Sequence, residues 1–158
     1  MVKQLVLIYM GLCSGMVGAK TAAVPKQAIQ VFEAYADKAF CARQADAELQ
    51  YIGHATYLAT HADFCGHGGN GMPRQVITAL QGKPSGSGAL RYQIVAANIL
   101  ADLDIWGSVE SIASDEQTIQ VTMRQMAPDD ARCCPSLLTR YTIEIGSWRL
   151  LRQEQLAP

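Results

Sequence analysis

The stretch TIQVTMR, residues 118–124, alternates strictly between polar and apolar residues. This period of two places all its apolar side chains on one face of an extended strand and its polar side chains on the other. The stretch YTIEI, residues 141–145, repeats the alternation, and a Gly-Ser turn at 146–147 leads into a further apolar segment at 148–151. Both stretches therefore predict antiparallel strands with one face on a core and the other face in water.

Two more strands are predicted on the N-terminal side of this pair. Residues 90–96 alternate apolar residues with polar or small ones, and residues 105–112 form a second, weaker strand. The second strand contains Gly107, and a lone glycine inside a strand is typical of a β-bulge. The C-terminal part of the chain, about 88–153, is thus expected to form an antiparallel sheet of four or five strands.

The N-terminal half instead repeats its apolar residues at helical spacing. Over 25–46 these residues recur three and four positions apart with charged residues between them, which predicts an amphipathic helix. A second helix is predicted over about 47–64, because apolar residues there are spaced by four, three, four and three positions. These residues are Tyr51, Ala55, Leu58, Ala62 and Cys65. A short helix is predicted at 73–80, between glycine-rich loops that begin at Gly66 and Gly82.

These elements together predict an α+β domain, in which N-terminal helices over about 25–81 pack on one face of the C-terminal antiparallel sheet. A chain of 158 residues has the length of one such domain. Hydrophobic residues make up 49% of the chain and charged residues 17%, which excludes a disordered chain and a protein that spans a membrane many times. A formal net charge of −1 leaves no basic excess to hold a phosphate backbone, so we expect no nucleic-acid partner.

The first 19 residues have the pattern of a secretory signal peptide. A lysine precedes an uncharged apolar run at 5–17, and small residues at the end of this run offer a cleavage site. The run is shorter than the roughly 20 residues of a membrane-spanning helix, so we expect cleavage and a mature single domain over 20–158 that spans no membrane. A lipidated Cys13 is the alternative, but a leucine stands where a small residue should precede a lipidated cysteine. The expected location is the periplasm or the exterior of the cell.

Four cysteines remain in the predicted mature chain: Cys41, Cys65, Cys133 and Cys134. An even number of cysteines in an exported chain predicts disulfide bonds. We favour Cys41–Cys65 with Cys133–Cys134, because the first two lie within one predicted helical region. The crossed pairings, which would join the two halves of the chain, stay open. The four cysteines include no Cys-x-x-Cys motif, so a structural role is favoured over redox catalysis.

Three histidines, His54, His61 and His67, lie within 14 residues of one another, and Cys65 lies among them. Imidazole and thiolate are ligands that zinc and copper accept, so a metal-handling protein is one open interpretation. On the predicted helix, however, His54 and His61 lie two turns apart, and an exported cysteine is more often oxidised than metal-bound. We therefore expect no metal site and no cofactor.

No residues stand in the pattern of a nucleophile and its base, so we assign no catalytic residue. The turn before residue 137 combines charged side chains with proline and the adjacent cysteines, and we expect it to contact a partner. Its candidate contact residues are Asp129, Asp130, Arg132 and Pro135. The leading interpretation is a non-enzymatic protein that binds another protein or an envelope component, as an inhibitor or an immunity protein does.

A small-ligand binder is the alternative interpretation. Its pocket would lie between the helices and the sheet, where aromatic side chains line an apolar cavity. The aromatic residues expected there are Trp106, Trp148, Tyr92 and Tyr141.

The order of segments over about 82–153 resembles a group of exported bacterial domains. A small Gly-Ser opening at 86–88 is followed by two strands, an aspartate-containing turn into Cys-Cys-Pro-Ser at 133–136, and a final hairpin that contains Tyr141. Mycobacterial lipoproteins of the LppP/LprE type look like members of this group. The resemblance implies export and a similar C-terminal fold, and it transfers no catalytic residue. This chain departs from the group in its helical, histidine-containing N-terminal half and in the absence of a lipobox.

Overall fold

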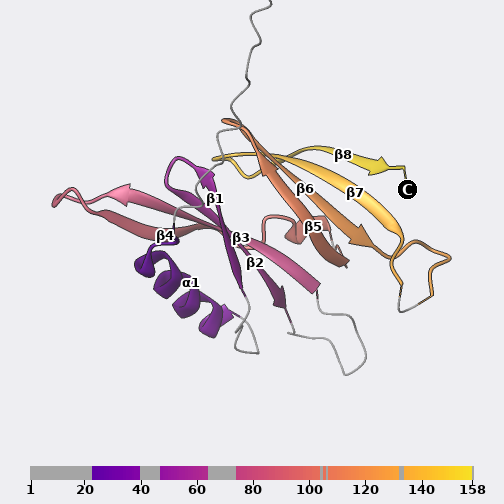
Figure 1. Cartoon of the computed structure of the whole chain (residues 1–158), viewed down its shortest axis with the longest axis horizontal. Coiled ribbons are helices and arrows are strands. Elements are labelled where there is room, and N and C mark those ends of the chain that lie inside the picture. The colour runs from indigo at the N-terminus through magenta and orange to yellow at the C-terminus, as the bar shows by residue number, and fades with distance from the viewer. Residues whose placement is uncertain are drawn as a thin grey trace, which may run out of the picture.

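The computed structural model describes residues 23–39, 47–63, 74–103, 105, 107–131 and 134–157. These residues form one α-helix, a short 3-10 helix and two four-stranded antiparallel sheets (Figure 1). The helical elements are α1, Lys26–Ala39, and η1, Ala101–Leu103. The strands of sheet A are β1, Glu48–Gly53; β2, Thr56–Asp63; β3, Arg74–Pro84; and β4, Leu90–Ala96. The strands of sheet B are β5, Gly107–Ser114; β6, Thr118–Gln125; β7, Leu137–Glu144; and β8, Leu150–Leu156.

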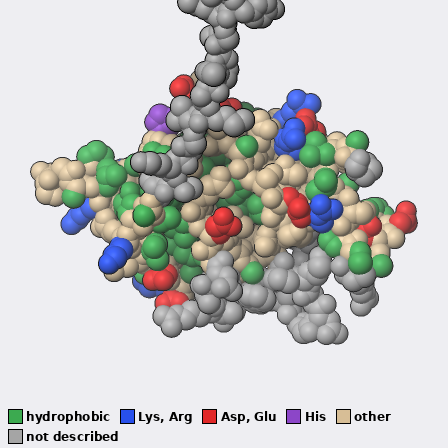
Figure 2. Space-filling model, viewed as in Figure 1, with side chains coloured by type: hydrophobic (Ala, Val, Ile, Leu, Met, Phe, Trp, Pro, Cys, Tyr) green, Lys and Arg blue, Asp and Glu red, His purple; other side chains and the backbone are tan. Residues whose placement is uncertain are grey.

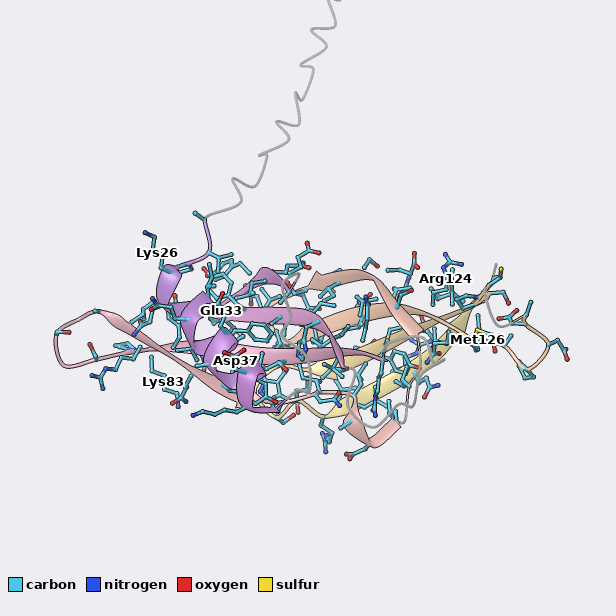
Figure 3. The ribbon with its side chains drawn as sticks, turned by 90° about the horizontal axis from the view of Figure 1, so that it is seen from below. Lys26, Glu33, Asp37, Lys83, Arg124 and Met126 are labelled. Carbon is cyan, nitrogen blue, oxygen red and sulfur yellow. The ribbon has the colours of Figure 1, made fainter. Side chains whose placement is uncertain are left out.

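Both sheets are meanders, in which each strand pairs with its neighbours in the chain. The hairpin of β3 and β4 extends beyond the rest of the molecule, as Figure 1 shows at the left. A backbone hydrogen bond from Ser85 to Ala89 closes the loop of this hairpin. The loop between β6 and β7 lies at the other end, because Lys83, on β3, and Met126, after β6, lie toward opposite ends of the molecule in Figure 3.

Sheet A forms the middle of three layers. Its inner face packs against sheet B, and Leu58 and Ile77 lie in the buried core that the two sheets share. Its outer face is covered by α1, whose Phe32 packs with Ala59 and Leu80 (Figures 1 and 3). Fully burying a large apolar side chain contributes about 1.5–3 kcal/mol, so both faces of sheet A stabilise the fold.

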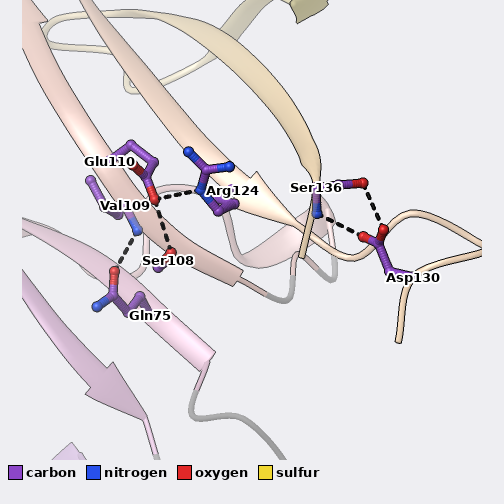
Figure 4. Close-up of polar contacts among 7 residues, drawn as sticks. All are labelled: Gln75, Ser108, Val109, Glu110, Arg124, Asp130 and Ser136. Atoms are coloured by element: carbon purple, nitrogen blue, oxygen red, sulfur yellow. Dashed lines mark hydrogen bonds and ion pairs between the residues drawn. The ribbon is translucent and has the colours of Figure 1, made fainter. Parts of the chain in front are cut away.

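Two glutamine side chains join the sheets at their margins. The side-chain Oε1 of Gln75, on β3, accepts a hydrogen bond from the backbone N–H of Val109, on β5 (Figure 4). The side-chain Nε2 of Gln50, on β1, donates to the backbone carbonyl of Ile112 at 3.0 Å. Since both bonds connect residues more than 30 positions apart, they tie the two halves of the chain together.

The predicted α+β arrangement is wrong. The helix predicted at 47–64 is the hairpin of β1 and β2, and the short helix predicted at 73–80 falls on β3. The reason is that β2 and β3 lie in the middle layer, so both of their faces are buried and a polar–apolar alternation is missing. The run VITAL, residues 76–80, is buried throughout, and its alanine and leucine residues also have high helix propensity. Packing between α1 and sheet B overrides that propensity.

Other predicted elements are confirmed. The helix predicted over 25–46 is found as α1 over 26–39, with 40–46 outside the described residues, and the strands predicted in the C-terminal half are β4 to β8. Two placements differ from the prediction, however. Strand β4 pairs with β3 in sheet A, and α1 packs on sheet A. The segment 25–81, which was expected to be helical, therefore contributes strands to a second sheet.

Gly107, the first residue of β5, does not mark the β-bulge. The pairing of β5 with β6 shifts between Val109 and Ser111 instead. Gly107 opposes Gln125 with a φ of +157°, and a Cβ atom at this position would overlap the backbone carbonyl oxygen of Arg124. Glycine is needed at position 107 because the backbones of β5 and β6 approach each other too closely for a side chain.

Candidate functional site

A pocket of ≈ 340 Å³ opens at the end of the molecule that carries the β6–β7 loop. It lies between Leu103, Ile105 and the inner face of sheet B. Its volume falls within the range of about 300–1,000 Å³ that small-molecule sites occupy. Among the described residues, the lining consists of Leu103, Ile105, Gln125, Met126, Leu137, Tyr141 and Gln153. Their side chains offer apolar walls and three hydrogen-bonding groups, and none of them is charged.

The strand register explains why polar side chains reach this end of the core. Along β6, Met123 lies in the core, and the next residue on the same face of the strand is Gln125. On β8, Gln153 opposes Tyr141 of β7 and therefore shares its face. The alternation that fills the core along β6 thus continues with Gln125, and Gln153 reaches the same face through its pairing with Tyr141.

Tyr141 forms the floor of the pocket. Its side chain is 1% exposed, and its hydroxyl donates a hydrogen bond to Oε1 of Gln125 at 3.1 Å. Burial raises the pKa of Tyr141, while its side-chain hydrogen bonds with Gln125 and Thr139 act in the opposite direction. The hydroxyl is therefore protonated at neutral pH. Thr139 also forms a side-chain hydrogen bond with Tyr141, so the group that can still donate to a ligand is the amide nitrogen of Gln125.

The β6–β7 loop forms part of the rim, because Met126 and Leu137 stand at its two ends. Asp130 gives this loop its shape (Figure 4). Its Oδ2 accepts hydrogen bonds from the backbone N–H groups of Ala127 and Ser136, both at 2.7 Å, and its Oδ1 accepts one from the Ser136 hydroxyl at 2.6 Å. These bonds, with the Ser136 hydroxyl first, lower the pKa of Asp130.

The residues predicted to contact a partner have different roles in this loop. Asp130 is engaged within the loop, while Asp129 is exposed on the turn and Pro135 is half-buried. Arg132 lies outside the described residues. The partner contact at this tip stays a prediction, and the structure assigns Asp130 to the loop itself.

Cys134 follows on the same loop and is disulfide-bonded. The other predicted disulfide residues, Cys41, Cys65 and Cys133, lie outside the described residues, as does the predicted signal peptide at 1–19. The pairing of the cysteines therefore stays a prediction.

Replacing Asp130 with asparagine is expected to lower stability at pH 7 and to have little effect in strong acid. A carboxylate whose pKa is lower in the folded state adds stability above its unfolded-state pKa, and this contribution is lost as the pH falls through the lowered pKa. Urea unfolding at pH 7 and near pH 2 measures both effects. Asp129→Asn is the matched control, because Asp129 makes no hydrogen bond within the described residues. An equal loss of stability at both pH values would contradict this role.

A β-hairpin stands where a helix was predicted, and it places His54 and His61 in different surroundings. His54 is exposed in the turn between β1 and β2, whereas His61 is buried between α1 and sheet A. The Nε2 atom of His61 lies 3.1 Å from the hydroxyl of Thr78, and its ring packs against Phe32. His67 lies outside the described residues. Within the described part of the chain, no group of three His, Cys, Asp or Glu residues could hold a metal ion.

Of the aromatic residues predicted to line a pocket between the N-terminal helices and the sheet, Tyr141 lines a pocket elsewhere, beside Leu103 and Ile105. Tyr92 instead packs 5.9 Å from the ring of Tyr57 on the outer face of sheet A. Trp148 packs against the shared core, and Trp106 lies outside the described residues. The sequence signal for the missed Gln125 is that it continues the apolar alternation of β6 on its core-facing side.

Comparison with known proteins identifies no relative. No protein-family model matches the chain, and neither the curated proteins nor the solved structures include a significant match. Among the described residues, no helix has the length and the apolar character needed to cross a membrane.

Proposed function

We propose that this protein is an exported, non-enzymatic binding protein whose pocket takes the apolar end of a small amphiphilic ligand. The observation that carries the proposal is the pocket of ≈ 340 Å³, whose described lining residues are uncharged, with a tyrosine–glutamine hydrogen bond at its floor. Burying an apolar group in such a pocket is favourable because it removes apolar surface from water. The polar floor would orient a ligand that carries one hydrogen-bonding group.

Binding is favoured over catalysis by the chemistry of the lining. The described lining residues include no carboxylate, imidazole, thiol or amine, which are the groups that general acid–base and covalent catalysis use. On the face shown in Figure 2, acidic and basic side chains of the described residues are interspersed. Among the described residues, therefore, neither the pocket lining nor this face gathers charge of one sign that would attract an ionic substrate.

The rim favours a ligand that extends out of the pocket. Leu103 is 37% exposed at the entrance, and the β6–β7 loop, which Asp130 holds in shape, stands beside it. A ligand whose apolar end lies in the pocket would place its remaining part against this loop. Among envelope components, an amphiphile has both an apolar end for the pocket and a second part that can lie against the loop. Such a ligand combines the two interpretations drawn from the sequence, a protein that binds an envelope component and a protein that binds a small ligand.

The binding of N-phenyl-1-naphthylamine, an uncharged apolar dye whose fluorescence rises in apolar surroundings, tests the pocket. Leu103→Arg is expected to weaken dye binding by about tenfold or more, equivalent to at least about 1.4 kcal/mol, because a charge at the entrance opposes burial of the dye. Leu90→Arg is the matched control, because Leu90 is 40% exposed on the hairpin at the opposite end of the molecule. Equal losses in both variants, or no dye binding to the unaltered protein, would contradict the proposal.

A further inference from the structure

Strand β8 is the free edge of sheet B. It pairs with β7 on one side, and within the described part of the chain no strand pairs with its other side (Figure 1). Leu151 is 48% exposed, and the side chain of Arg152 is 70% exposed. An edge strand presents unpaired backbone N–H and C=O groups, and these groups can pair with a strand of another chain.

The features that usually protect an edge are scarce in this strand. Proteins block exposed edges with proline, lysine, a bulge or a covering element. The sequence of β8, LLRQEQL, contains neither proline nor lysine. The register of β7 and β8 shifts once, between the pairs Thr142–Arg152 and Ile143–Leu150, so the segment 152–156 runs in regular register with β7. This segment is therefore suited to continue the sheet.

The sequence of β8 is complementary to itself in the antiparallel direction. When two copies pair about Gln153, Arg152 of each copy lies opposite Glu154 of the other. Directly opposed residues share a face of the sheet, and pairs of opposite charge in such positions are stabilising.

Charge also fixes the register of this pairing. Sliding one copy by two residues sets Arg152 against Arg152 in one direction and Glu154 against Glu154 in the other. Like charges directly opposite each other are destabilising, so only the register centred on Gln153 satisfies both residues. Within one chain Glu154 already contacts Arg140 at 3.1 Å and Arg152 at 2.7 Å. A second Arg152 would extend this group of charges across the edge.

We infer that two copies of this chain associate through their β8 strands, antiparallel and about a two-fold axis at Gln153. The result is one continuous sheet of eight strands in which the same edge serves both copies, as in an isologous dimer. Gln153 also lines the pocket. Each copy therefore supplies a residue at the rim of the other copy's pocket, and the two pockets open beside the axis. This dimer does not depend on the nature of the ligand.

Charge reversal followed by sedimentation analysis tests the dimer. Arg152→Glu sets two pairs of glutamates against each other across the axis, and Glu154→Arg does the same with arginines. Each variant alone is expected to raise the dimer dissociation constant by about tenfold or more. An equimolar mixture is expected to recover the association, because the two glutamates of one variant then lie opposite the two arginines of the other.

Arg91→Glu is the matched control, because it reverses an exposed charge on β4, an edge of sheet A. It is expected to leave the association unchanged. Thermal unfolding of each variant verifies that it is folded, since Glu154→Arg also removes the contact with Arg140. A monomeric unaltered protein, dimers that survive both reversals, or a mixture that stays monomeric would each overturn the inference.

Discussion

Replacing Phe32 with alanine is expected to lower the free energy of unfolding by about 3–5 kcal/mol, as for other buried aromatic side chains. Phe32 is the largest fully buried side chain of α1, and its ring centroid lies 5.1 Å from that of His61. The neighbouring Ala36 and Ala59 are too small to fill the cavity that would remain between α1 and sheet A. Urea unfolding followed by circular dichroism measures the loss.

Glu33→Ala serves as the control, because Glu33 is exposed on the same helix (Figure 3) and alanine favours a helix. Its effect is expected to stay within about 0.5 kcal/mol. If Phe32→Ala were as stable as Glu33→Ala, α1 would not be anchored to sheet A through this ring.

Gly107→Ala is expected to destabilise the protein by roughly 2–5 kcal/mol, the sum of backbone strain and overpacking. The added methyl group would overlap the backbone carbonyl oxygen of Arg124, and a backbone cannot move aside as a flexible side chain can. The pairing of β5 with β6 must therefore open at Gln125. Because Gln125 also contacts Tyr141 at the floor of the pocket, the variant should weaken dye binding as well.

Gly86→Ala is the control for this substitution. Gly86 lies in the loop of the β3–β4 hairpin, and a Cβ atom there would meet nothing within 4 Å. Thermal unfolding should place Gly86→Ala within about 0.5 kcal/mol of the unaltered protein. Equal stability of the two alanine variants would show that β5 and β6 can separate at Gly107 without cost.

The sequence predicts the strands of sheet B because each has one face in water. The polar–apolar alternation of 118–124 and 141–145 survives in the structure as buried and half-buried positions along β6 and β7. The prediction fails at β2 and β3, whose two faces both pack against other layers. A strand with no solvent-exposed face shows no polar–apolar alternation, and the spacing of its apolar residues can match that of a helix by chance.

The candidate site is predicted only in part, for a related reason. Tyr141 stands out as a large aromatic residue, and it does line the pocket. Gln125 and Gln153 resemble surface residues in the sequence, because only the pairing of three strands brings them to one face. Where the role of a residue depends on contacts between distant segments, the residues next to it in the sequence indicate little about that role.

The meander order of both sheets has a consequence for how the chain folds. Every strand pair joins segments that follow one another in the chain, and contacts of short sequence separation form with a small loss of chain entropy. The hairpins of sheet B can therefore assemble without help from the N-terminal half. Helix α1 comes first in the chain, but the surface that receives Phe32 exists only after β2 and β3 have paired. We thus expect the first element in the sequence to be among the last to acquire its native environment.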